Sequence, residues 1–195
     1  IQKKNCDFKH ISQAEENHNL IELISEDIYS DENRFIIELL QNCDDSTKCK
    51  NLNLHIYFND QKNRIIFSYN GKPFDEEDVK AVCSSGNSTK KTDKEKIGYK
   101  GIGFKSVLSS SDKVTLISKY FSFRFDKKEC YTRMASFYKI DKNEIKFPWQ
   151  VYPIWTEINE LDSDIHYILK KEYEVNIMID VYRANYQKAK TAIFE

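Results

Sequence analysis

Glycine is scarce in this chain and confined to one part of it. The 195 residues include 5 glycines, and all of them lie between Gly71 and Gly103. Three of these, Gly98, Gly101 and Gly103, fall close together in the sequence. Glycine lets the backbone take positive φ angles or approach another group closely. One segment is therefore expected to have specialised backbone, and the rest to form ordinary helices, strands and loops.

Long apolar runs and an excess of one charge sign are also missing. No run approaches the roughly 18 apolar residues that a membrane-spanning helix needs. The formal net charge is −1, although 31% of the residues are charged. Such a balance gives no bulk attraction to nucleic acid or to an acidic membrane. We expect a soluble cytoplasmic domain with no membrane partner, and a nuclear location stays open.

Closely spaced cysteine pairs are absent as well. The 5 cysteines are scattered, and no two form a C-x-x-C pair. An odd, scattered set disfavours both a disulfide framework and a zinc site.

The length suits one domain, so we expect a single domain over residues 1–195 with a core over about residues 15–182. Because the chain begins at Ile1 without methionine, we expect it to be the N-terminal fragment of a larger protein.

Hydrophobic periodicity predicts a mixture of helices and strands. Helices are expected over residues 15–29, 34–46, 75–83, from residue 104 onward, and 183–195. Strands are expected over residues 52–58, 64–69, 113–119, 121–126 and 173–182. Between them, residues 84–96 are polar, rich in lysine and without periodicity, which is typical of a loop.

The helix over residues 34–46 carries a row of polar side chains. At about 100° per residue, Glu38, Asn42 and Asp45 fall within roughly 60° of one another on the helix surface. A solvated helix face is the ordinary explanation of such a row. The opposite, apolar face is expected to consist of Ile36, Leu39, Leu40 and Cys43.

The glycine stretch stands immediately before the helix expected from Phe104. Free backbone N–H groups at the start of a helix can hold an anion, so this stretch predicts a phosphate cradle. A tight turn between two elements is the alternative. The stretch is not a Walker loop, because no Gly-Lys-Ser/Thr follows a four-residue gap after an earlier glycine.

Four blocks in a fixed order resemble the GHKL ATPases, which include gyrase, the ninety-kilodalton heat-shock chaperone, histidine kinases and MutL. They are ELLQNCDDS at 38–46, NGKPF at 70–74, SGNSTK at 85–90 and IGYKGIGFKS at 97–106. The similarity is greatest to the chaperone-like branch with sacsin-type and NOV-type ATP-binding domains. It implies a Bergerat fold, an α/β (α+β) two-layer sandwich whose mixed, mostly antiparallel sheet has helices on one face.

The resemblance also implies roles for individual residues. Glu38 would be the general base for the water that attacks the γ-phosphate, Asn42 would bind Mg²⁺ through its side-chain oxygen, and Asp45 would lie near the base and ribose. Mg²⁺ prefers hard oxygen ligands and shares phosphate oxygens, so one protein amide is adequate. The remaining nucleotide-binding residues would be Asn70, Gly71, Ser88, Thr89, Gly98, Tyr99, Lys100, Gly101, Ile102, Gly103, Phe104 and Lys105.

Some of these assignments have simpler alternatives. Lys100 and Lys105 would supply positive charge to the phosphates or would be ordinary solvated lysines. The hydroxyl groups of Ser88 and Thr89 would contact phosphate or form a simple ST-turn. Residues 84–96 would be the lid over the nucleotide.

Two positions depart from the family pattern. Tyr69 stands where relatives carry an aspartate that accepts a hydrogen bond from the adenine amino group, so Asn70 or Asp45 would have to supply the acceptor. Val175 stands in a segment where relatives tend to have a Gly-Thr pair entering the last strand. Both departures weaken the base-binding side of the expected pocket.

The expected function is Mg²⁺-dependent ATP binding and slow ATP hydrolysis, with lid closure driving a conformational change in a larger protein. The alternative is a non-hydrolysing nucleotide sensor, or a scaffold or interaction module. Expected partners are ATP or ADP and the remaining domains of the larger protein, while an ATP-dependent homodimer and the process driven by the cycle stay open.

Two further activities are not predicted. Acidic residues dilute the lysines of residues 90–96, which carry no row of stacking aromatics, so direct nucleic-acid binding is not expected. Histidine kinase activity is not expected either, and the histidines are taken as ordinary surface or strand residues. They are His10, His18, His55 and His166.

Overall fold

The fold is built on a six-stranded antiparallel sheet. The computed structural model describes residue 8 and residues 10–28, 33–47, 51–84, 100–171 and 173–194. In these ranges the strand order is β1-β2-β6-β3-β4-β5, and each neighbouring pair is antiparallel. The strands are β1 (Leu54–Asn59), β2 (Arg64–Tyr69), β3 (Ser111–Ser118), β4 (Phe121–Asp126), β5 (Ile154–Trp155) and β6 (Val175–Val181).

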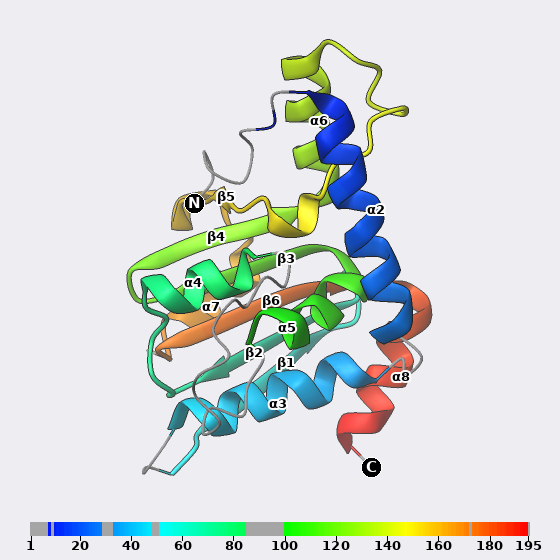
Figure 1. The fold of residues 1–195 in the computed structure, drawn as a ribbon. Helices are drawn as coiled ribbons and strands as arrows, with labels where there is room; N and C mark the ends of the chain where they lie inside the picture. Colours follow the sequence, from blue (N-terminus) through cyan, green and yellow to red (C-terminus); the bar gives the residue numbers. More distant parts are fainter. Residues whose placement is uncertain are drawn as a thin grey trace, which may run out of the picture.

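The helices cover the sheet mainly on one face, so the expected two-layer α/β fold is confirmed. Figure 1 shows α3, α4 and α5 together in front of the sheet and α7 behind it. The helices are α2 (Ile11–Ile28), α3 (Arg34–Thr47), α4 (Glu76–Val82), α5 (Lys100–Ser109), α6 (Lys127–Tyr138), α7 (Ser163–Leu169) and α8 (Arg183–Phe194), with short 3₁₀ turns η1 (Trp149–Val151) and η2 (Ile158–Glu160).

Alternation along the strands divides the interior into two clusters. On β2, Ile65 and Phe67 point into the main core with the buried residues of α3, α4 and α5, while Ile66 points to the other face. On that second face, Ile165 and Ile168 of α7 cover Ile66 and its apolar neighbours. The expectation of helices on one face was therefore incomplete, because an apolar second face must also be covered.

The sequence missed two helices and misplaced two helix starts, since α2 begins at Ile11, four residues before the expected start at Glu15. Helix α6 follows β4 directly, and Asp126 caps it by accepting a hydrogen bond from the Glu129 backbone N–H at 2.9 Å. Helix α7 was also not expected. Helix α5 begins at Lys100, four residues before the expected start at Phe104, so Gly101 and Gly103 belong to its first turns rather than to a preceding loop.

Two smaller expectations were wrong. Leu40 is 39% exposed, and Phe35, at 2%, takes its place on the buried face of α3. His18 is neither a surface nor a strand residue, because it lies buried in α2 with Nε2 3.1 Å from Glu22 Oε1. Among the described residues, no helix is both long and apolar enough to span a membrane.

Candidate functional site

Helix α3 supplies the central residues of the predicted site. Its buried side chains fix it against the sheet, which leaves Glu38 and Asn42 half-buried and Asp45 exposed. The Glu38 side chain is 21% exposed, and its Oε1 lies 3.6 Å from Arg34 Nε one turn earlier. A partly exposed pair of this kind, at this distance, contributes little to stability. The carboxylate of Glu38 is thus accessible to water at the edge of the core.

Gly71 brings the second sequence block against the end of α3. A Cβ atom at Gly71 would lie 1.9 Å from Ser46 Oγ and 2.8 Å from Tyr69 Cε2. The Lys72 backbone N–H donates to the Ser46 carbonyl at 3.1 Å. Only glycine fits this close approach, and the turn after β2 is therefore joined to the C-terminal end of α3. The role of Ser46 was not recognised from the sequence, although it stands in the first block.

Asn70 holds a neighbouring segment rather than standing free. Its Oδ1 accepts the Asn53 backbone N–H at 2.8 Å, and its Nδ2 donates to the Asn51 carbonyl at 3.2 Å. These bonds tie the approach to β1 to the exit of β2. Asn70 thus has a structural role, and its side-chain amide is already engaged by the backbone in this conformation.

The first turn of α5 provides the backbone expected to hold phosphate. Helix α5 contacts both α3 and α4, and the three helices lie side by side in Figure 1. The first backbone N–H groups of a helix have no partner within the helix, so the cradle expected from Gly101, Ile102 and Gly103 becomes a helix terminus rather than a loop. The predicted site residues Ser88, Thr89, Gly98 and Tyr99 lie outside the described residues, as does the expected lid beyond Ser84.

The side chains of Phe104 and Lys105 are both buried. Phe104 is 2% exposed, so it can offer only its backbone to a ligand. Lys105 is 6% exposed, and its Nζ donates to the carbonyls of Val82 at 2.8 Å and Gln150 at 2.9 Å. Burial lowers the pKa of Lys105 to about 8. It is therefore not the solvated lysine considered above, and in this conformation its ammonium group binds backbone carbonyls.

The two departures from the family pattern are direct neighbours. Tyr69 and Val175 face each other in the register of β2 and β6, and both are buried in the main core. Burial is the first cause that raises the pKa of Tyr69, and Cys43 and Asp78 add to it. The tyrosine ring therefore occupies the space between β2 and the helices that cover it. Burial also raises the pKa of Cys43 to about 12, so this thiol stays protonated.

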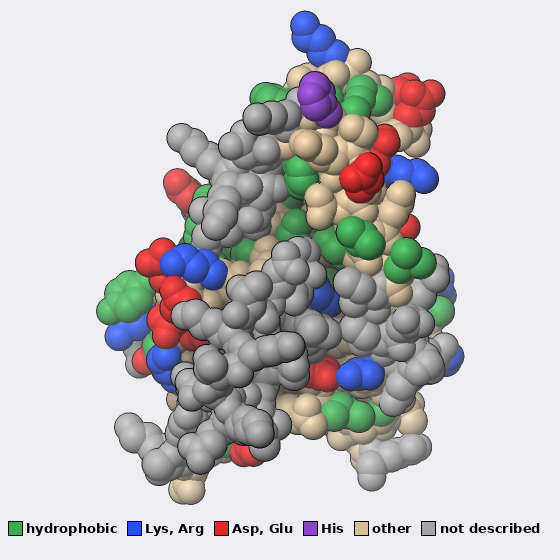
Figure 2. Space-filling model, in the orientation of Figure 1, with side chains coloured by type: hydrophobic (Ala, Val, Ile, Leu, Met, Phe, Trp, Pro, Cys, Tyr) green, Lys and Arg blue, Asp and Glu red, His purple; other side chains and the backbone are tan. Residues whose placement is uncertain are grey.

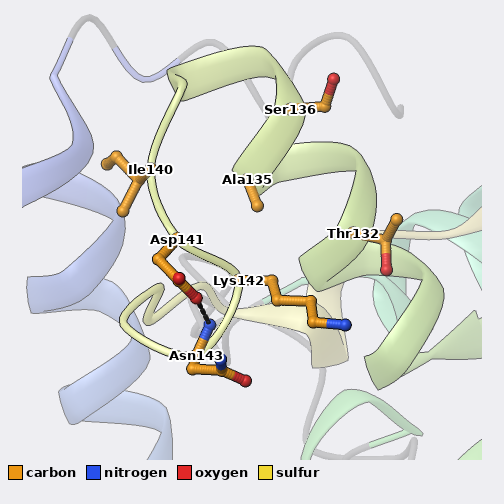
Figure 3. Close-up of a pocket in the computed structure, with 7 residues that line it drawn as sticks. All are labelled: Thr132, Ala135, Ser136, Ile140, Asp141, Lys142 and Asn143. Carbon is orange, nitrogen blue, oxygen red and sulfur yellow. Dashed lines mark hydrogen bonds between the residues drawn. The ribbon is translucent and has the colours of Figure 1, made fainter.

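Two hollows in the described surface lie elsewhere. One, of about 420 Å³, lies between α6 and the turn that follows it, where Asp141 Oδ1 accepts the Asn143 backbone N–H at 2.8 Å (Figure 3). The other, of about 110 Å³, lies on the α7 face and includes Arg124 and Asp162. Neither is lined by a predicted site residue. Among the described residues, no group of three His, Cys, Asp or Glu side chains is placed to hold a metal ion.

The described charges are mixed in sign. On the face shown in Figure 2, basic and acidic side chains are interspersed on the described surface. The structure brings α3, the Gly71 turn and α5 together on one face of the sheet. The side chains of Asn70 and Lys105 bind backbone groups of neighbouring segments instead.

Comparison with known proteins identifies the family. A sacsin domain matches residues 15–178. The chain is also 40% identical over 106 residues to Protein NO VEIN from Arabidopsis thaliana, a match that covers 54% of this chain but only 4% of that protein. The chain thus corresponds to a small part of this much longer relative. Because the family match extends over most of the chain, this protein belongs to the sacsin domain family.

Proposed function

We propose that this domain binds ATP with Mg²⁺ and hydrolyses it slowly, and that the bound nucleotide changes the conformation of a larger protein. One observation supports the proposal most directly. Three sequence blocks that are far apart in the chain meet on one face of the sheet, where α3 contacts the Gly71 turn and α5. Polar side chains, a close backbone turn and the N–H groups of a helix start are the parts that a phosphate site needs.

The residues present fit a magnesium-nucleotide complex in their donor chemistry. Asn42 offers a half-buried amide oxygen, and Glu38 offers a carboxylate one turn earlier on the same helix. Mg²⁺ bound with phosphates keeps several waters and needs few protein ligands, so one protein amide is adequate. When bound, the ion would neutralise phosphate charge during transfer.

In this proposal, different residues of the chain would bind the metal, hold the phosphates and activate water. Asn42 would hold the metal, and the N–H groups of the first turn of α5 would hold phosphate oxygens. Glu38 would orient a water and accept its proton, because a general base must lie within hydrogen-bond reach of the attacking water. Asp45, exposed near the end of α3, would offer its carboxylate to the base or ribose, since the Asn70 amide binds backbone groups.

Titration calorimetry with a non-hydrolysable ATP analogue, with and without Mg²⁺ and repeated with GTP, tests binding. We expect Mg²⁺-dependent binding that Asn42→Ala weakens. A domain that binds no nucleotide would contradict the proposal and favour a scaffold, which the buried Tyr69–Val175 pair makes the specific alternative.

Phosphate release tests hydrolysis separately. Glu38→Gln should lower the rate by about 10²-fold or more if Glu38 is the general base, while ATP binding is retained. Asp44→Asn is the matched control, because it removes an exposed carboxylate from the same helix. Equal rates for Glu38→Gln and the parent would exclude the role given to Glu38, and binding without any release would identify a nucleotide sensor.

A further inference from the structure

Lys105 is buried where four elements meet. Its own helix is α5, its Nζ donates to Val82 at the end of α4 and to Gln150 in η1, and it lies 5.8 Å from the centre of the Phe125 ring on β4. Lysine is almost never fully buried without compensation. Hydrogen bonds to a charged donor are about twice as strong as neutral ones, so these contacts compensate for the lost hydration.

The Val82 carbonyl is a natural partner for a cation. The last carbonyls of a helix have no partner within the helix and carry the negative end of its dipole. Val82 is the last residue of α4, and Cys83 caps the helix through its own backbone N–H. Lys105 therefore binds the C-terminal end of α4 from the neighbouring helix, and the bond to Gln150 attaches η1 at the same point.

The position of α5 matters because this helix also contacts α3. A shift of α5 would change the distance between its first turn and the Glu38 and Asn42 side chains. Anchoring α5 to α4 and η1 restricts such a shift. Misplacement of a binding group by about 1 Å can cost up to about 100-fold in function.

We infer that Lys105 is a positioning residue, whose ammonium group holds α4 and η1 on α5 and thereby sets the first turn of α5 for nucleotide. This inference rests on the proposed nucleotide function. The described contacts show that Lys105 anchors α4 and η1 to α5, and this anchoring affects binding only if nucleotide binds at the first turn of α5. Lys105 itself does not touch the nucleotide in this scheme.

The test compares Lys105→Met with Lys80→Met. Methionine replaces the aliphatic stem of lysine with one of similar length and removes the ammonium donors, and Lys80 is an exposed lysine of α4 that pairs with Glu76 and Glu77. Below the unfolding temperature, Lys105→Met should weaken Mg²⁺-dependent binding of the ATP analogue by about tenfold or more. It should also speed hydrogen exchange at residues 82–84 and 151–152, whereas Lys80→Met should behave as the parent in both respects.

The outcomes separate this inference from the proposed function. Unchanged affinity in Lys105→Met, with only a lower unfolding temperature, would overturn the positioning role. If the parent binds no nucleotide, the proposed function fails, and the positioning role fails with it. Exchange at residues 82–84 and 151–152 then tests the anchoring alone, and unchanged exchange in Lys105→Met would overturn that too. If Lys105→Met does not fold, hydrogen exchange in the parent protein provides the test. Bound nucleotide should slow exchange at these residues, and a lack of slowing would contradict the inference.

Discussion

At the scale of single residues, Gly71 is the position where the chain tolerates no side chain. Ser46 and Tyr69 both lie closer to a Cβ at this position than contacting atoms allow. Gly71→Ala should therefore lower the free energy of unfolding by about 1–3 kcal/mol, the usual cost of overpacking. Urea unfolding followed by circular dichroism measures the change.

A second substitution can identify which neighbouring atom causes the strain in Gly71→Ala. The nearest atom is Ser46 Oγ, so Ser46→Ala should recover part of the cost in the double variant. Full recovery is not expected, because Tyr69 Cε2 and Ser46 Cβ also lie within 3 Å of the added carbon. Purely additive effects of the two substitutions would show that the contact with Ser46 Oγ is not the source of the strain.

At the scale of elements, α4 depends on the cap at its start. Asp75 accepts the Asp78 backbone N–H at 2.9 Å, and Asp78 accepts that of Asp75 in return. Asp75→Ala should cost about 1 kcal/mol in the free energy of unfolding, while Asp75→Asn should keep most of the cap, since both residues are good N-caps. Thermal unfolding at neutral pH distinguishes these outcomes, and equal losses for both variants would contradict the cap.

The same cap predicts a dependence on acid. The hydrogen bond from Lys72 and those from backbone N–H groups lower the pKa of Asp75 to about 2, from an ordinary value of 3.8. A lowered pKa means that the contribution to stability is present above about pH 4 and is lost as the pH falls toward 2. Asp75→Asn should lack this part of the acid dependence. The effect is modest, because both side chains are largely exposed.

The elements that could be predicted were those with clear periodicity or a clear cap. Strands β2, β3, β4 and β6 were predicted closely, and α4 was predicted from Asp75. Helix α6 was missed because its apolar residues are few and are mixed with aromatic and charged ones, and α7 was missed because a helix of seven residues is too short to show a clear period. The early start of α5 was missed because two glycines usually argue against a helix, and contacts of α5 with α3 and α4 override that preference.

At the scale of the whole molecule, an ion network joins the sheet to α7. The Arg64 side chain is 4% exposed, and it donates to Asp180 of β6, to Asp162 and to Asp164 of α7. Arg64→Met should lower the free energy of unfolding by about 3–5 kcal/mol, because it leaves carboxylates in or near the core without their main cation. Chemical denaturation measures this loss.

Lys62→Met provides the matched control. Lys62 pairs with two of the same carboxylates, but its side chain is 41% exposed. Its loss should cost less than about 1 kcal/mol, as exposed pairs usually do. Similar losses for the two variants would show that burial of Arg64 is not what makes the network important.

The sequence by itself determined most strands, because hydrophobic period and caps are local properties of the chain, and the two-layer class of fold and the blocks expected to meet followed from the resemblance that those blocks carry. Tertiary structure decided the rest. It inserted β6 between β2 and β3, so that Tyr69 and Val175 became neighbours. It also buried Lys105 against two carbonyls. Such pairings depend on residues far apart in sequence, and no local pattern in the chain records which of them will touch.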